Sequence, residues 1–200
     1  MTHWLEPLTI IKTLGVVGVW GVIFAESGLF FGFFLPGDSL LFTAGFLASR
    51  GLADILPLWL GAALAAVLGD LVGFWFGRRA GPKIFYRENS FFFNKNHIAR
   101  TQSFYERYGN KTIVLARFVP VVRTFAPILA GVAGMNYRRF ARYNVIGGVA
   151  WVSAFIVGGW SLGALIPNAE QYVTLIIGAI VMLSLLPALW HLWRERRHSA

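Results

Sequence analysis

Residues 117–123 read RFVPVVR, and they lie inside the apolar segment 112–136, TIVLARFVPVVRTFAPILAGVAGMN. The segment is hydrophobic enough to enter a membrane, yet it carries two arginines. A guanidinium does not shed its charge, so Arg117 and Arg123 at membrane depth are unfavourable by several kcal/mol unless each is paired or hydrated. The stretch therefore predicts either buried partners for both arginines or a water-filled cavity beside them.

The backbone of this segment is also expected to be broken. Pro120 lies between the arginines and Pro127 follows, and each proline removes a backbone donor. Pro120 also disfavours helical geometry at Val119. Broken backbone within a bilayer is tolerated only where protein or a water-filled cavity shields it. Two fixed cations on a broken apolar hairpin indicate an anion site; the alternative is that both arginines reach out to lipid headgroups.

The composition places the chain among polytopic helical membrane proteins. Of its 200 residues, 56% are hydrophobic and only 14% are charged, whereas a soluble domain carries about 25% charged residues. The formal charge of +9 fits the basic cytoplasmic loops of membrane proteins, so no nucleic-acid partner is expected. The absence of cysteine excludes disulfides and thiolate sites.

The expected fold class is an all-α membrane protein with two opposed re-entrant helical hairpins in an inverted repeat, plus transmembrane helices. The first hairpin has a spanning arm, 14–35, and an arm too short to cross, 39–49, on either side of Pro-Gly-Asp. The single transmembrane domain 1–200 is divided into 14–49 as re-entrant hairpin 1, 57–76 as a transmembrane helix, 77–111 as a cytoplasmic amphipathic connector, 112–136 as re-entrant hairpin 2, and 145–166 and 172–193 as transmembrane helices.

The distribution of basic residues predicts the orientation. Eight lysines and arginines lie in 77–111, and further arginines follow at 138–142 and 194–197. By the positive-inside rule these segments and the C-terminus are cytoplasmic. The side of the N-terminus stays open.

A weak internal repeat supports the two hairpins. SLLFTAGFLA from Ser39 aligns with FAPILAGVAG from Phe125, each an apolar arm centred on an Ala-Gly pair. Each hairpin is followed by a helix with Gly and Trp at similar spacing, GDLVGFWFGRRAG from Gly69 and WVSAFIVGGWSLG from Trp151. Two hairpins that enter from opposite faces are typical of inverted-repeat transporters. The alternative is chance similarity among Gly- and Ala-rich segments.

Four ionisable residues are predicted at membrane depth on the hairpins: Glu26, Asp38, Arg117 and Arg123. Two acids and two bases can form a neutral quartet, which is the inexpensive way to bury all four. At the tip of the first hairpin, the backbone N–H of Gly37 suits the oxygens of an anion. Intramembrane ionisable residues are functional by default, although a quartet can also be purely structural.

Other polar residues point to no catalytic chemistry. Asp70 is predicted to relay protons, to cap a helix or to pair with Arg78 or Arg79. The four histidines lack metal-ligand spacing, so neither a metal nor a cofactor is expected. No serine, threonine or cysteine has a base at motif spacing, and the chain is therefore expected not to be an enzyme.

Several of these motifs together resemble the DedA family of bacterial inner-membrane proteins. The resemblance rests on Glu26, on PGD at 36–38, on GD at 69–70 with GR at 77–78, and on RFVPVVR, all in family order over residues 20 to 165. It implies opposed re-entrant hairpins in a multi-pass protein of the bacterial inner membrane, and transport of polyprenyl phosphate lipid carriers, chiefly undecaprenyl phosphate.

The resemblance also suggests roles for individual residues. The family's acidic pair falls on Glu26 and Asp38, expected to couple protons, and its arginine pair on Arg117 and Arg123, expected to bind the lipid phosphate with Gly37. Asp70 and Arg78 match a connecting motif of structural or gating role. Expected partners are the polyprenyl phosphate, protons and membrane phospholipids, and a homo-oligomer stays open. The alternative function is a proton-coupled ion antiporter.

Overall fold

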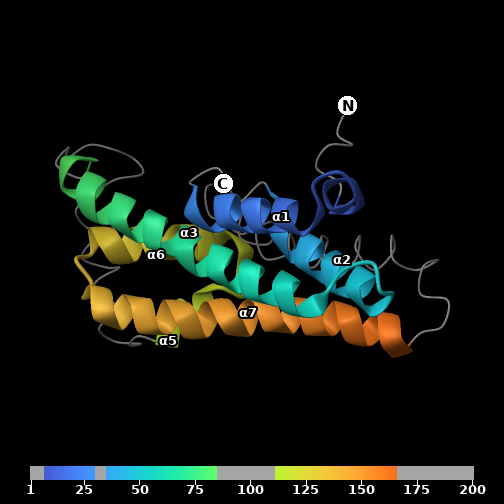
Figure 1. The fold of residues 1–200 in the computed structure, drawn as a ribbon. Helices are drawn as coiled ribbons and strands as arrows, with labels where there is room; N and C mark the ends of the chain where they lie inside the picture. Colours follow the sequence, from blue (N-terminus) through green and yellow to red (C-terminus); the bar gives the residue numbers. More distant parts are fainter. Residues whose placement is uncertain (1–6, 30–34, 85–110, 166–200) are drawn as a thin grey trace, which may run out of the picture.

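The computed structural model describes residues 7–29, 35–84 and 111–165, and these residues form six helices and no strand. Figure 1 shows the two longest helices, α3 and α7, side by side along the length of the molecule. The described part of the chain is thus all-helical, as predicted. The predicted helix 172–193 and most of the connector 77–111 lie outside the described residues. The helices are α1 (Pro7–Gly28), α2 (Gly37–Ser49), α3 (Ile55–Ile84), α5 (Lys111–Ala116), α6 (Pro120–Val132) and α7 (Tyr137–Leu165).

Both long helices are suited to cross a bilayer. Ile55–Ala80 and Tyr137–Leu165 are apolar stretches of 26 and 29 residues. At about 1.5 Å per residue each exceeds the ~30 Å hydrocarbon core of a membrane. Only 39% and 33% of their most apolar windows are buried inside the protein. Their remaining apolar surface faces outward, as expected for helices in lipid rather than for core helices of a soluble protein.

Contacts at both ends show that α3 and α7 are antiparallel. Near the start of α3, the indole N–H of Trp59 donates to the hydroxyl of Ser153, at 2.8 Å. Farther along α3, Phe74 stacks on Phe140, with 4.4 Å between ring centroids. The residue number falls along α7 as it rises along α3, so the charged start of α7 lies beside the charged end of α3.

The second arm of the first hairpin packs on the second half of the chain. On α2, Gly45 lies so close to α7 that a Cβ would overlap the carbonyl oxygen of Ile156. On α7, a Cβ at Gly159 would overlap the carbonyl oxygen of Phe42. The two helices therefore approach backbone to backbone, which only glycine permits.

The same contact recurs between α6 and α3. A Cβ at Gly131 would overlap the carbonyl oxygen of Phe74, and one at Gly77 would overlap that of Ile128. When Gly69 is placed opposite Trp151, and Ser39 opposite Phe125 as in the sequence, the repeat relates the two contacts residue by residue. It pairs Gly45 with Gly131, Ile156 with Phe74, Gly159 with Gly77, and Phe42 with Ile128.

The second arms of the two halves are therefore exchanged. Helix α2 of the first half packs on α7 of the second, and α6 of the second half packs on α3 of the first. Chance similarity between Gly- and Ala-rich segments does not explain why equivalent glycines make equivalent contacts in both halves. The repeat therefore holds for the packing of the helices as well as for the sequence. The re-entrant course of the hairpins through a membrane stays a prediction.

Three predicted boundaries need correction. The first arm does not run over 14–35, because α1 begins at Pro7, breaks at Gly15 (φ 61°, ψ −155°) and ends at Gly28. Residues 77–84 belong to α3 and not to a separate connector. Helix α7 begins at Tyr137 rather than at 145. Lysine and arginine are good helix formers, so the basic residues that end an apolar run do not end the helix.

The predicted break in the second hairpin is confirmed. Helix α5 ends at Ala116, and the next three amides bond to carbonyls three residues back, as in a tightened helical turn. Val119 is extended (φ −113°, ψ 108°), and Pro120 opens α6. Pro127 lies within α6, which continues past it. The break separates Arg117 from Arg123 and gives each its own helix end.

Candidate functional site

The first ionic cluster centres on Arg123, in the first turns of α6. Its guanidinium donates to the carboxylate of Asp38 on α2, at 2.5 Å, and to that of Glu26 on α1. The side chain of Glu26 is 1% exposed, and those of Arg123 and Asp38 are 12% and 13% exposed. The buried guanidinium of Arg123 thus joins α6 to α1 and α2 through two acids that are both far from it in the sequence.

The start of α2 completes this cluster. A Cβ at Gly37 would overlap the carboxylate of Glu26, so the glycine lets the acid lie against the first turn of α2. Asp38 occupies the same turn. The N-terminus of a helix presents unpaired N–H groups and partial positive charge, which favour an anion there. Both carboxylates therefore occupy an anion-binding position.

Trp151 of α7 holds the remaining side of the cluster. Its indole N–H donates to Oδ1 of Asp38, at 2.9 Å, and the guanidinium of Arg123 lies 4.7 Å from the ring centroid. The residue is 2% exposed. Sequence reasoning used Trp151 only to align the repeat. Its position in the middle of an apolar helix, away from the span ends where tryptophans usually collect, is the signal that would have identified it.

The second ionic cluster centres on Arg117, just after the end of α5. Its guanidinium donates to the carboxylate of Asp70 on α3 and to the side-chain oxygen of Asn144 on α7. It also reaches the carbonyl oxygen of Ala66, at 3.4 Å. Asn144 in turn donates its amide to the carbonyl of Val67, at 3.0 Å. The cluster fastens α5 to both long helices, and sequence reasoning missed Asn144.

Two glycines of α7 make room for Arg117. A Cβ at Gly147 would come within 3.1 Å of its Cδ, and one at Gly148 within 3.3 Å of its Nη1. Arg117 is 4% exposed as a result. The alternative that both arginines extend to lipid headgroups is therefore wrong, since Arg117 and Arg123 are both buried against carboxylates.

The expected quartet is also wrong in one respect: Arg117 is not bonded to Glu26 or Asp38. The break before Pro120 turns Arg117 toward α3 and α7 and leaves Arg123 facing α1 and α2. Asp70 was predicted to pair with Arg78 or Arg79, but its partner in the structure is Arg117. Those two arginines are exposed, and the guanidinium of Arg78 lies 5.9 Å from the ring centroid of Trp75.

The two clusters differ in charge and in bonding. Arg117 and Asp70 neutralise each other, whereas Arg123 faces two acids, which leaves one negative charge in excess when both are ionised. Among the described residues, Oε2 of Glu26 has no hydrogen-bond partner in the Arg123 cluster, and Nε of Arg117 has none in the other cluster. The Arg123 cluster therefore has spare polar capacity for a proton or a ligand.

Comparison with known proteins assigns the chain to a family. The VTT domain matches residues 35–161, a range that holds both arginines, Asp38, Asp70 and Trp151. The DedA protein of Escherichia coli is 45% identical over 184 residues, which cover 90% of this chain and 82% of that protein. An uncharacterized membrane protein of Mycobacterium leprae is 43% identical over 182 residues, covering 90% of this chain and 81% of its own.

A more distant relative is named by location. The inner membrane protein YghB of E. coli is 32% identical over 158 residues, covering 77% of this chain and 70% of that protein. No solved structure matches the chain. The domain match and the identities over most of both chains agree with the two helices that are long and apolar enough to span a membrane: this chain belongs to the DedA family of membrane proteins.

Proposed function

We propose that this protein is a transporter that moves a polyprenyl phosphate lipid carrier, such as undecaprenyl phosphate, across the bacterial inner membrane, coupled to the movement of protons in the same direction. The observation that carries the proposal is the sharing of buried Arg123 between Glu26 and Asp38 at the start of α2. A site of this kind can alternate between an internal anion and an external one.

The donors of the cluster suit a phosphate. A guanidinium binds the oxygens of a phosphate in the same forked geometry as those of a carboxylate. A helix N-terminus favours phosphate as it favours an acid. The carboxylate of Glu26 lies against both Arg123 and the first turn of α2, so a phosphate that displaces it gains both contacts at once.

The excess acid offers a means of proton coupling. When a proton neutralises Glu26, its hold on Arg123 weakens, and one side of the guanidinium becomes free for the lipid phosphate. When the proton leaves, the ion pair re-forms and the phosphate is expelled. Trp151 holds Asp38 through its indole N–H and the guanidinium of Arg123 against its ring through both steps. In this scheme the inward movement of lipid follows the inward movement of protons.

The second cluster has a supporting role in this proposal. The hydrogen bonds of Arg117 to Asp70, Asn144 and the carbonyl of Ala66 all use its Nη2. We assign the phosphate to Arg123 because this arginine lies between two acids at the start of α2. Arg117 holds α5 against α3 and α7, and it thereby fixes the start of α6. Asp70 is then a positioning residue rather than a proton relay.

The exchanged packing of the arms supports re-entrant hairpins. The contact of α2 with α7 and that of α6 with α3 are equivalent under the repeat, while α3 and α7 run in opposite directions. This relation is what two hairpins inserted from opposite membrane faces require. The basic ends of α3 and α7 then lie in the cytoplasm, together with the C-terminus.

The test is reconstitution in proteoliposomes with labelled undecaprenyl phosphate, with and without a pH gradient. We expect accessible label to appear across the bilayer faster with the gradient. Arg123→Gln is expected to abolish this transfer, whereas Arg142→Gln, an equal change of charge at an exposed position of α7, leaves it intact. Proton-driven cation exchange without lipid transfer would support the antiporter instead, and released inorganic phosphate would indicate a phosphatase.

A further inference from the structure

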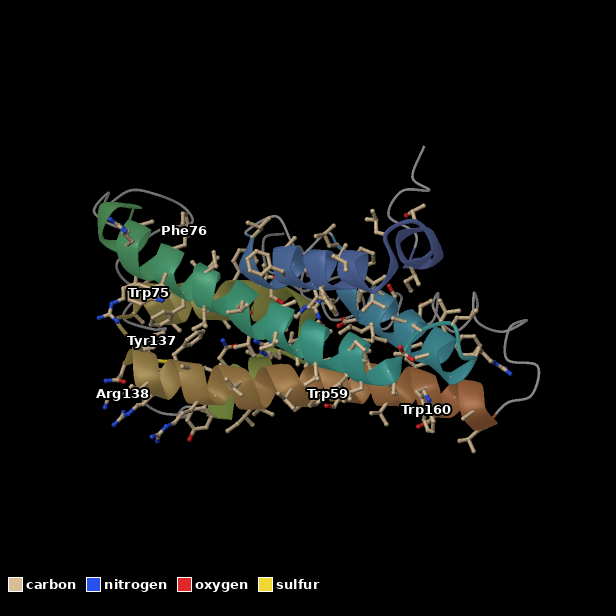
Figure 2. All side chains as sticks on the ribbon, in the orientation of Figure 1. Trp59, Trp75, Phe76, Tyr137, Arg138 and Trp160 are labelled. Carbon is tan, nitrogen blue, oxygen red and sulfur yellow. The ribbon has the colours of Figure 1, made fainter. Side chains whose placement is uncertain are left out.

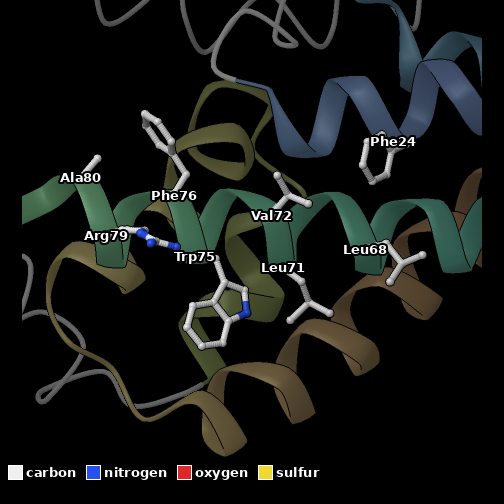
Figure 3. A pocket seen from close by; sticks show the side chains of 8 residues that line it. All are labelled: Phe24, Leu68, Leu71, Val72, Trp75, Phe76, Arg79 and Ala80. Carbon is white, nitrogen blue, oxygen red and sulfur yellow. The ribbon is translucent and has the colours of Figure 1, made fainter.

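The outward face of α3 carries an apolar groove of about 760 Å³. Figure 3 shows its walls, with Phe24 of α1 at one end and Arg79 toward the other. Arg79 is the only charged residue among those that line it. The groove is separate from the Arg123 cluster, because Phe24 and the buried Glu26 are two residues apart and point to different sides of α1, about 200° apart.

Two rows of side chains on α3 form the groove. Leu68, Val72 and Phe76 follow one another at a spacing of four, which places them in a single ridge along the helix. Leu71, Trp75 and Arg79 form the neighbouring ridge. Because α3 is long enough to span the bilayer, the groove runs along the direction in which a lipid chain lies.

The Arg79 end of the groove has the features of a membrane–water boundary. Figure 2 shows Trp75, Tyr137 and Arg138 together at this end of the α3–α7 pair. The rings of Trp75 and Tyr137 are 5.7 Å apart between centroids. The exposed residues Arg78, Arg138, Arg139 and Arg142 belong to the same end. Aromatic rings beside arginines are typical of the level of lipid headgroups on the cytoplasmic side.

We propose that this groove is a binding site for one anionic phospholipid, with an acyl chain between the two ridges and its phosphate on Arg79. The guanidinium of Arg79 supplies a forked donor for the phosphate oxygens. A net negative headgroup gains about 1 kcal/mol from one basic residue near the surface, and Arg79 is the basic residue that lines the groove. A zwitterionic headgroup brings an ammonium into the same field and loses this advantage.

A second copy of the chain suits the groove less well. In a symmetric pair formed through this face, the arginines at the end of α3 and the start of α7 would face their own copies. Like charges placed opposite one another disfavour such an interface. An anionic lipid neutralises this end of the molecule, whereas a second copy doubles its charge.

The proposal is tested with lipids whose acyl chains carry bromine, which quenches tryptophan fluorescence on contact. The full chain is reconstituted with brominated phosphatidylglycerol or brominated phosphatidylcholine in an unlabelled bilayer. The contribution of Trp75 is the difference between the wild-type protein and Trp75→Phe. We expect half-quenching of Trp75 at a fraction of phosphatidylglycerol about fivefold lower than that of phosphatidylcholine, the factor that ~1 kcal/mol gives.

Two variants locate the preference. Arg79→Gln is expected to reduce the ratio between the two lipids to near one. Arg142→Gln removes the same charge at the same end but outside the groove, and it should leave the ratio largely intact. Glu26→Gln should also leave the ratio unchanged while it alters proton-coupled transport, so the lipid site and the proposed function succeed or fail separately.

Two results would overturn the lipid site. Equal quenching by the two lipids would mean that bulk lipid merely touches an exposed helix. If neither lipid quenched Trp75, protein would cover the groove, either another part of this chain or a second copy.

Discussion

Replacing Arg117 by Gln should destabilise the protein strongly, and replacing Asp70 by Asn at the same time should restore most of the loss. Both side chains are 5% exposed, and removal of one partner from a buried ion pair costs about 3–5 kcal/mol. For a chain of this length, ~1 kcal/mol corresponds to about 2–4 °C in Tm. The single variant should therefore unfold about 6–20 °C lower. The measurement is thermal unfolding of the detergent-solubilised protein, followed by tryptophan fluorescence.

The choice of second substitution makes this test specific. Asp70→Asn leaves two neutral side chains that can hydrogen-bond to each other, so the double variant should approach the stability of the wild type. Glu26→Gln should not rescue Arg117→Gln, because these residues belong to different clusters. It should instead recover part of the loss in Arg123→Gln, in which Asp38 still lacks its cation. If Glu26→Gln restored the stability of Arg117→Gln better than Asp70→Asn did, the division into two clusters would be refuted.

Three further predictions follow from the geometry. Glu26→Gln should retain binding of lipid phosphate but lose the dependence of transport on external pH, which proteoliposomes at two pH values would reveal; unchanged pH dependence would contradict proton coupling at this acid. Trp151→Phe keeps a ring but removes the N–H donor to Asp38, a charged hydrogen bond of about 1.5–3 kcal/mol, so the transport rate should fall at least ~10-fold. An unaltered transport rate would count against a positioning role for Trp151. Gly159→Ala should lower the thermal stability because the added Cβ meets the backbone carbonyl of Phe42, whereas the neighbouring Gly158→Ala, whose Cβ has no atom nearer than 3.8 Å, should not. Equal effects of the two substitutions on Tm would contradict the close approach of α2 to α7.

The break before Pro120 and the repeat were predictable because they depend on residues close together in the sequence, whereas the break at Gly15 was not predicted. Pro120 fixes the extended conformation of Val119 in any fold, and this prediction is confirmed. The alignment of Ser39 with Phe125 rested on small residues at equal spacing. Small residues within a membrane mark where helices touch, so the alignment correctly related two helix contacts.

The pairing of the charges was not predictable in the same way. Composition shows that two acids and two bases at membrane depth need partners, but many pairings satisfy that need. Arg117 and Arg123 are six residues apart, which on an unbroken helix already places them about 120° apart around the axis. This spacing is the signal that they face different neighbours. That Asp70 faces Arg117 depends on where the break after α5 places this arginine beside α3, which no local pattern specifies.

Asn144 and Trp151 were missed for a related reason. Each is a single polar or amphipathic residue within an apolar helix, and neither belongs to a recognisable motif. A side-chain amide within lipid must find hydrogen-bond partners. The sequence therefore predicts that Asn144 makes a polar contact, but not with which residue. Only the antiparallel packing of α7 on α3 shows that its partners are Arg117 and Val67.

The exchange of arms between the halves determines which parts of the molecule can move as one body. Because α2 packs backbone to backbone on α7, and α6 on α3, we expect each pair to move as one body. Each of these bodies combines helices from both halves of the chain. The natural pivots are then the turn at 50–54, between α2 and α3, and the turn at 133–136, between α6 and α7, where the two bodies meet. A fragment that ends between the two halves would lack the surface on which its own arm rests, so neither half is expected to fold when expressed alone.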